Sequence, residues 1–241
     1  MPVAVFDAYG TLLDVHSAMA RHAARLGPDW PRISQEWRAK QLEYTWVRSL
    51  AGAAHHRDFA GLTDAALAFV AARRGIADAA LLADLRAAYR ALDAYPEVPA
   101  MLAALRVAGW RTAILSNGAP KMLAEGVAAA GLAGLLDAVL SVEAAGVFKP
   151  DARVYRLATD HFAIAPAEVV FVSSNAWDAF GALEFGFRVV WVNRSGQPDE
   201  YGLRGRVEEV PDLTSPPRLM VSWGRFTDGD NPPQNRPPVA P

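Results

Sequence analysis

The sequence predicts an α/β protein, in which a Rossmann-like parallel sheet with helices on both faces carries an inserted all-helical domain. Beyond residue 96, short apolar segments recur at intervals of about 20–30 residues, and segments of helical character separate them. Such alternation of strands and helices is typical of a parallel sheet. A similar apolar segment opens the chain, whereas residues 15–95 show helical spacing of apolar residues throughout.

Five apolar segments are predicted to be the strands of this sheet. Residues 2–6 (PVAVF) form the first, and the others cover residues 112–115, 138–140, 169–172 and 189–192. Their short runs of β-branched residues are typical of strands that are buried on both faces. The helices expected between them cover residues 101–108, 121–130, 151–161 and 178–185, and Gly109 and Gly131 are expected to end the first two.

The segment of residues 15–95 is rich in Ala, Leu, Arg and Glu. Ser34 is expected to be the N-cap of a long amphipathic helix, and residues 63–73 and 79–92 predict two more. We therefore expect a catalytic core of residues 1–14 and 96–214 and a helical cap of residues 15–95. The proline-rich residues 215–241 are expected to form a flexible tail.

Composition narrows the range of functions. The 241 residues carry 24 Lys and Arg against 26 Asp and Glu, a net charge of −2, so the basic excess that favours nucleic-acid binding is missing. There is no cysteine, which excludes disulfides, thiolate metal ligands and a cysteine nucleophile. The N-terminus does not resemble a secretory signal, and no long uncharged apolar stretch predicts a membrane span. We expect a cytoplasmic protein without nucleic-acid or membrane partners.

Polar side chains follow four of the predicted strands, at the edge where ligands bind in open parallel sheets. They are Asp7, Tyr9 and Thr11 after the first strand, Ser116 and Asn117 after the second, Lys149 near the third, and Ser173, Ser174, Asn175, Trp177 and Asp178 after the fourth. Since the carboxyl ends of parallel strands meet at one edge, these residues predict a single site.

Asp7 has two possible interpretations, a turn residue or a carboxylate nucleophile. A nucleophile needs a rigid position at a strand end and nearby hydrogen-bond donors. The spacing Asp-x-x-Gly-Thr favours this second interpretation, because Gly10 permits a tight turn that can bring the Thr11 hydroxyl back toward Asp7.

Four segments resemble the signature sequences of the haloacid dehalogenase superfamily, and within it those of the L-2-haloacid dehalogenases. They are FDAYGTLLD at 6–14, LSNG at 115–118, FKPDARVY at 148–155 and SSNAWDAFGA at 173–182. Residues 37–46 (WRAKQLEYTW) resemble the cap-helix signature of these enzymes, and the resemblance extends over roughly residues 1–220. Ala39 departs from the pattern, since a Gln is expected there, and the sequence leaves the preferred halogen and chain length open.

The resemblance implies that Asp7 attacks C2 of a small halogenated carboxylic acid and displaces halide with inversion. Water then hydrolyses the resulting aspartyl ester and releases a D-2-hydroxy acid. The superfamily's Mg²⁺-dependent phosphatases have a second Asp at the position of Tyr9 and an acidic pair near Asn175. Because a hard cation needs several anionic oxygens, this chain is expected to need neither a metal nor another cofactor.

The resemblance also implies the roles of the other residues. Lys149 is the expected cation beside Asp7, and its hydrogen-bond network is expected to contain Thr11, Tyr155, Ser173, Asn175 and Asp178. The halide is expected to bind Arg38, Asn117 and Trp177. Ser116 and the backbone N–H groups of Ala8 and Tyr9 are expected to hold the substrate carboxylate, and Trp37, Leu42, Phe59 and Tyr9 to line an apolar pocket.

Two alternatives remain open from the sequence. One is a Mg²⁺-dependent phosphatase of the same superfamily, which Tyr9 and Asn175 disfavour. The other is a non-catalytic binding protein on the same fold, which the joint presence of Asp7, Arg38, Lys149, Asn175 and Asp178 disfavours. A homodimer is expected from the resemblance only.

Overall fold

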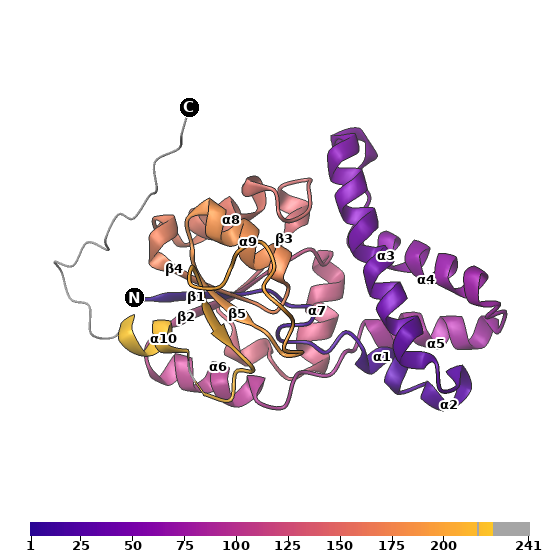
Figure 1. Cartoon of the computed structure of the whole chain (residues 1–241). Coiled ribbons are helices and arrows are strands. Elements are labelled where there is room, and N and C mark those ends of the chain that lie inside the picture. Colours follow the sequence, from indigo (N-terminus) through magenta and orange to yellow (C-terminus); the bar gives the residue numbers. More distant parts are fainter. Residues whose placement is uncertain (216, 224–241) are drawn as a thin grey trace.

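Six parallel strands form a single sheet in the order β3-β2-β1-β4-β5-β6 (Figure 1). This computed structural model describes residues 1–215 and 217–223. The strands are β1 (Val3–Phe6), β2 (Arg111–Ser116), β3 (Ala138–Ser141), β4 (Val169–Ser173), β5 (Arg188–Val192) and β6 (Glu208–Val210). The predicted α/β class with a parallel sheet is confirmed.

The centre of the sheet determines where the site lies. All residues of β1 and β4 are buried, in agreement with their continuous apolar sequences. In the register of the sheet, Phe6 of β1 lies between Ile114 of β2 and Val172 of β4. The residues that follow these three strands therefore emerge at the same level, beside one another.

Helices cover both faces of the sheet. They are α6 (Val98–Val107), α7 (Pro120–Ala129), α8 (Ala152–Phe162), α9 (Ala176–Phe185) and α10 (Arg218–Trp223), and the short 3₁₀ helices are η2 (Ala133–Leu135), η3 (Val142–Ala144) and η4 (Pro166–Glu168). Figure 1 shows α8 and α9 on one face and α6 and α10 on the other.

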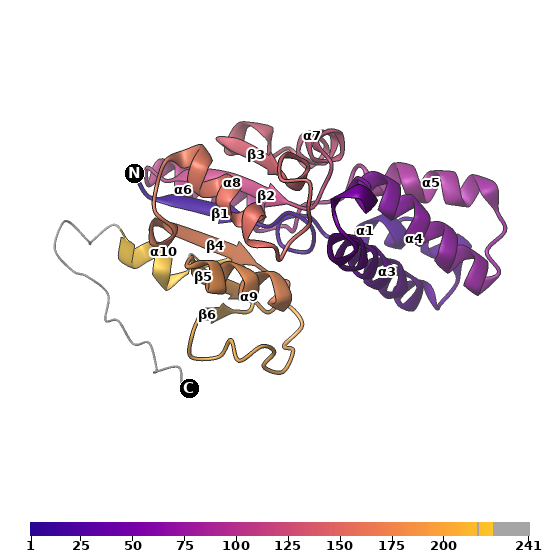
Figure 2. The same ribbon diagram turned by 90° about the horizontal axis from the view of Figure 1, so that it is seen from above.

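The chain between β1 and α6 forms a separate body, which we call the helical group. It contains α1 (Ser17–Ala20), α2 (Ala23–Leu26), α3 (Trp30–Ala51), η1 (Ala53–His55), α4 (Phe59–Arg74) and α5 (Ala79–Tyr89). Figures 1 and 2 show this group beside the sheet, at the end where β1 leads into it. The helical group therefore faces the carboxyl ends of the strands.

Two details differ from the sequence-based expectation. Helix α3 begins at Trp30, with Pro31 in its first turn, a position that favours proline. Ser34, which we expected to be the N-cap, lies inside the helix, and its Oγ is 2.7 Å from Nδ1 of His16. Strand β6 was not predicted, because its three residues Glu-Glu-Val are few and mostly polar.

Helix α10 lies within the segment that we predicted to be a tail, and its residue Met220 is buried against the core. The sequence did not predict this helix, and the flexibility expected from residue 215 stays a prediction. Residue 216 and residues 224–241 lie outside the described part of the chain. Among the described helices, none combines the length and apolar character that crossing a bilayer requires.

Replacing Phe6 by Ala tests the importance of the central strand. The Phe6 side chain is fully buried in β1, so its removal leaves a cavity that should lower the free energy of unfolding by about 3–5 kcal/mol. Val107→Ala, at a residue that is 91% exposed, is the control and should change it by less than about 0.5 kcal/mol. Equal effects in urea-unfolding measurements would contradict this assignment of the core.

Candidate active site

Asp7 stands at the carboxyl end of β1 and is almost completely buried. Its backbone N–H donates to the carbonyl of Val172 at 2.9 Å, so the sheet's hydrogen bonding extends to the residue itself. Oδ1 accepts a hydrogen bond from Nζ of Lys149 at 3.1 Å. Oδ2 accepts from Nδ2 of Asn175 at 2.8 Å and from Oγ1 of Thr11 at 3.3 Å. This is a rigid, partly desolvated carboxylate surrounded by donors, as a nucleophile requires.

Lys149 links two carboxylates. Its side chain is completely buried, and Nζ lies 3.1 Å from Oδ1 of Asp7 and 2.8 Å from Oδ2 of Asp178. The backbone N–H of Lys149 donates to Oδ1 of Asn117 at 3.0 Å, which ties the lysine to the end of β2. A buried charge is tolerated only when it is paired and hydrogen bonded, and both conditions hold here.

Asp178, in the first turn of α9, is completely buried and accepts three side-chain hydrogen bonds. Besides Lys149, Oδ1 accepts from the hydroxyl of Tyr155 at 2.8 Å, and Oδ2 accepts from Oγ of Ser173 at 3.1 Å. Burial raises the pKa of Asp178 from an ordinary 3.8 to about 6; Lys149 opposes this shift, and the negative charge of Asp7 adds to it. Asp178 can therefore accept a proton near neutral pH.

Ser174 completes the network, although the sequence assigned it no role. Its backbone N–H donates to Oγ1 of Thr11 at 2.9 Å, and its hydroxyl is hydrogen bonded to the carbonyl of Gly10. Gly10 has a φ of +90°, a conformation that glycine adopts easily. The loop after β4 thus holds the tight turn after β1. The only signal in the sequence was the position of Ser174 among the polar residues of that strand end.

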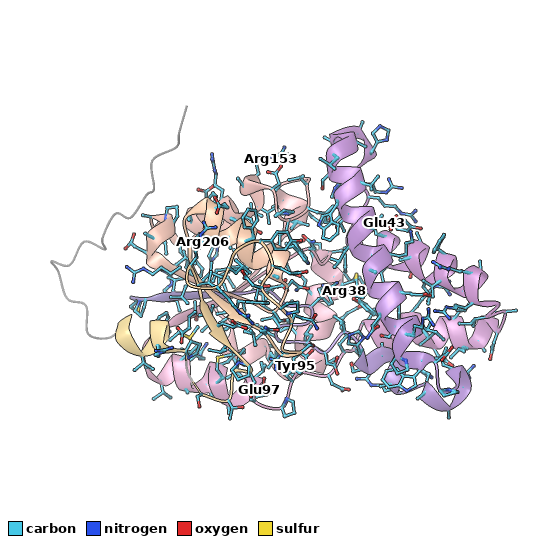
Figure 3. The ribbon with its side chains drawn as sticks, in the orientation of Figure 1. Arg38, Glu43, Tyr95, Glu97, Arg153 and Arg206 are labelled. Carbon is cyan, nitrogen blue, oxygen red and sulfur yellow. The ribbon has the colours of Figure 1, made fainter. Side chains whose placement is uncertain are left out.

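Arg194 is a second residue that the sequence did not indicate. Its Nη2 donates to the carbonyl of Thr11 at 2.9 Å, and its Nη1 donates to Oε1 of Glu97 at 2.6 Å. The guanidinium also lies over the ring of Tyr95, 3.7 Å from its centroid. Arg194 therefore fastens the loop after β1 to the segment that returns from the helical group, where Figure 3 labels Tyr95 and Glu97.

Tyr9 connects the site to the helical group. Its ring stacks on that of Tyr89, with centroids 5.8 Å apart, and lies 5.5 Å from the ring of Phe59. Burial raises the pKa of both tyrosines, so their rings are neutral walls. Trp37, expected at the pocket, lies one ring further inside the helical group, against Tyr89 at 4.8 Å.

Arg38 reaches the site from α3, on the side that faces the sheet (Figure 3). One of its terminal nitrogens donates to the carbonyl of Tyr9 in a long hydrogen bond of 3.3 Å. Nδ2 of Asn175 donates to the same carbonyl at 3.1 Å. Since a guanidinium has five N–H donors, this contact leaves donors for an anion.

The remaining predicted residues lie around this centre. Ser116 is buried at the end of β2, and its Oγ accepts the N–H of Gly118 at 3.1 Å. Leu42 is half-buried, one turn along α3 from Arg38. Trp177 stands edge to face with Trp46 of α3, with centroids 5.5 Å apart. Hydrogen bonds thus join Asp7, Thr11, Asn117, Lys149, Tyr155, Ser173, Asn175 and Asp178. The rings of Tyr9 and Trp177 pack against the helical group.

Comparisons with known proteins agree with this geometry. Residues 1–186 match the family of haloacid dehalogenase-like hydrolases. The chain belongs to this family. Like the four signature segments, the match covers Asp7, Lys149 and Asp178.

Similar curated members of the family are dehalogenases. (S)-2-haloacid dehalogenase 1 of Pseudomonas sp. (strain CBS-3) is 44% identical over 90% of this chain and 95% of its own. (S)-2-haloacid dehalogenase 4A of Burkholderia cepacia is 47% identical over 87% of this chain and 90% of its own. The L-2-haloacid dehalogenase of Xanthobacter autotrophicus, solved with chloropropionic acid covalently bound, is 38% identical with a TM-score of 0.82, over 92% of this chain and 98% of that one. The predicted resemblance to the L-2-haloacid dehalogenases is confirmed.

The raised pKa of Asp178 predicts a pH dependence of stability. Between about pH 4 and pH 6 the folded protein binds this proton more tightly than the unfolded chain does, so the free energy of unfolding should fall as pH rises. The side chain of the Asp178→Asn variant does not titrate. The difference between the wild type and this variant in free energy of urea unfolding therefore isolates the contribution of Asp178. If instead the wild type becomes less stable relative to Asp178→Asn as pH falls, the folded protein lowers the pKa of Asp178. The ion pair with Lys149 would then outweigh the effect of burial on this pKa.

Proposed function

We propose that this protein is a metal-independent (S)-2-haloacid dehalogenase, which converts L-2-haloalkanoates into D-2-hydroxy acids. The observation that carries the proposal is the Asp7 carboxylate at the end of β1, buried and held by Lys149, Asn175 and Thr11. Curated relatives at 44–47% identity are (S)-2-haloacid dehalogenases, and the Xanthobacter enzyme was solved with chloropropionic acid covalently bound, which supports a covalent step.

In the first step, a carboxylate oxygen of Asp7 attacks C2 of the substrate from the side opposite the halogen. The new C–O bond forms as the carbon–halogen bond breaks, the halide leaves with the bonding electrons, and configuration at C2 inverts. A halide needs no proton to leave, so Tyr9 at the position of the phosphatases' general acid is no obstacle.

The main difficulty of this step is electrostatic. Two carboxylates about 4 Å apart repel each other by about 4 kcal/mol at an effective dielectric constant near 20. Lys149 offsets this repulsion beside Asp7. Ser116 and the backbone N–H groups of Ala8 and Tyr9, which follow Asp7 directly, are the donors we assign to the substrate carboxylate.

Developing charge on the halide also needs donors. Arg38 is the main cation in this role, because its long bond to Tyr9 leaves N–H groups available. The Oδ1 atom of Asn117 accepts from Lys149, which leaves the Nδ2 amide hydrogens to face the halide. The ring edge of Trp177 completes this contact.

In the second step, water attacks Cγ of the esterified Asp7. Asp178 accepts the proton from this water, since its pKa is raised to about 6. Ser173 donates a hydrogen bond to Asp178 and Asn175 donates one to Asp7, so both carboxyl groups are held in place. Collapse of the tetrahedral intermediate breaks the acyl C–O bond, and the leaving alkoxide takes up the proton from Asp178 to become the 2-hydroxy acid. The Asp7 carboxyl group then loses the remaining proton of the water to solvent, which restores its carboxylate.

The occupied carboxylates support a reaction without a metal. The oxygens of Asp7 and Asp178 already accept hydrogen bonds from Lys149, Asn175, Thr11, Tyr155 and Ser173. In residues 1–215 and 217–223 there is no group of three or more His, Asp or Glu side chains suited to a metal ion. A hard divalent cation, which needs several anionic oxygens, would have to displace these donors.

The domain organisation follows the same proposal. We assign residues 15–95 as a cap over a catalytic core of residues 1–14 and 96–214, in agreement with the helical group between β1 and α6. A cytoplasmic location and a homodimer are further parts of the proposal. The lack of cysteine is compatible with the first, and the second rests on the family resemblance.

The proposal predicts chloride release from (S)-2-chloropropionate that continues in EDTA. Asp7→Asn should lower this rate by about 10⁴-fold or more, because it removes the nucleophile. Mass spectrometry after a single turnover in H₂¹⁸O should find the label in the Asp7 carboxylate. Product formation without label in Asp7, or activity only on phosphate esters with Mg²⁺, would overturn the mechanism.

Arg38→Ala should lower kcat for chloride release by about 100-fold or more, since it removes a preorganised charge from the departing halide. The melting temperature should change little, because the hydrogen bond from Arg38 to the carbonyl of Tyr9 is long, at 3.3 Å. Arg32→Ala, at an exposed position of the same helix, is the matched control and should retain full activity. An unchanged kcat in Arg38→Ala would remove this residue from the mechanism.

A further inference from the structure

The peptide groups around Lys149 are held both by the core and by the helical group. The backbone N–H of Lys149 donates to Oδ1 of Asn117 at 3.0 Å, next to the end of β2. The preceding N–H, that of Phe148, donates to Oγ of Ser49 at 3.2 Å, in the last turn of α3. Two successive N–H groups are therefore bound by different parts of the protein, and the position of the lysine backbone depends on both.

The ring of Phe148 is a second contact between this segment and the helical group. Phe148 is buried, and its ring centroid lies 5.0 Å from that of His56 and 6.5 Å from that of Phe59. Protein interiors are close-packed, so a shift of the His56 ring would displace Phe148. Because Phe148 is bonded directly to Lys149, such a shift would reach the lysine.

A hydrogen bond to the core holds His56 in this place. Nε2 of His56 lies 3.0 Å from Oε2 of Glu143 in η3, and the two side chains are only 20% and 24% exposed. A carboxylate oxygen accepts, so Nε2 of His56 is the donor. The other oxygen of Glu143, Oε1, is buried and has no hydrogen-bond partner within residues 1–215 and 217–223. Loss of the imidazole would leave the buried carboxylate without this donor, which is costly.

Glu143 is fixed in turn to the loop that carries Asn117. Its backbone N–H donates to Oγ of Ser141 at 3.2 Å, and the Ser141 hydroxyl donates to the carbonyl of Gly118 at 2.7 Å. Gly118 directly follows Asn117. His56 therefore joins the helical group to the same region of the core that binds the lysine backbone.

Resting on the proposed function, we propose that His56 and Ser49 are positioning residues for Lys149. Through them, the helical group sets the place of the ammonium group beside Asp7. Both act through Phe148 and not on the substrate. The first step of the reaction depends most on this place, because the ammonium group offsets the repulsion between Asp7 and the substrate carboxylate. A misplacement of about 1 Å can lower a rate about 100-fold, so a smaller shift should lower it about tenfold.

His56→Ala in the full chain tests the proposal. In rapid-quench measurements with (S)-2-bromopropionate, the rate constant of bromide release at saturation should fall about tenfold. The substrate concentration for half-saturation should change by less than about threefold, because the ammonium group is needed mainly in the transition state. His56→Gln keeps a side-chain N–H for Glu143 and should regain most of the rate. His55→Ala, at the adjacent exposed histidine, is the matched control and should keep the wild-type rate.

Two further variants locate the effect. Ser49→Ala removes the acceptor of the Phe148 N–H and should lower the same rate constant about threefold to tenfold. Glu143→Ala should lower it as well, and its effect should not add to that of His56→Ala, because the two residues act as one unit. Additive effects in this double-mutant cycle would contradict the assignment.

The outcomes separate this proposal from the proposed function. If the wild type releases no bromide, the proposed function fails and the positioning role fails with it. If the wild type is active and both His56→Ala and Ser49→Ala keep its rate, only the positioning role is overturned. A lower melting temperature of His56→Ala with an unchanged rate would likewise show a purely structural residue. If His56→Ala does not fold, Ser49→Ala decides, and a wild-type rate in that variant overturns the proposal.

Discussion

The ammonium group of Lys149 between Asp7 and Asp178 is the interaction on which the rest of this structure depends. Three charged side chains are buried together, and each would be costly to bury alone. The bridge is possible because three parts of the chain meet at one edge of the sheet. They are the end of β1, the segment before α8 and the start of α9. Removal of the lysine would leave two buried carboxylates without compensation, which is strongly destabilising.

The turn after β1 connects this charged centre to the helical group. Asp7 and Thr11 point into the hydrogen-bond network, whereas the ring of Tyr9 packs against Tyr89 on the other side. Arg194 binds the carbonyl of Thr11 and holds the returning segment as well. A displacement of the helical group would therefore be transmitted to the position of Asp7.

Different parts of the site tolerate change for different reasons. Several contacts fix each carboxylate of the polar centre, because Asp178 and Asp7 each accept hydrogen bonds from several residues on separate elements. The apolar seam is held only by packing between α3 and α9, as in the contact of Trp46 with Trp177. Substitutions are therefore easier to accommodate at the seam than among the polar residues around Asp7.

The sequence by itself determined the parallel sheet, five of its strands and the polar residues at their ends, because buried strands and strand-end polar residues are local patterns. It also indicated Asp7, Lys149 and Asp178 through the resemblance of short segments. Only the tertiary structure decided the start of α3 at Trp30, the short polar strand β6, the roles of Ser174 and Arg194, and the pairing of Trp46 with Trp177. These features depend on contacts between residues far apart in the chain, and local sequence carries little information about such contacts.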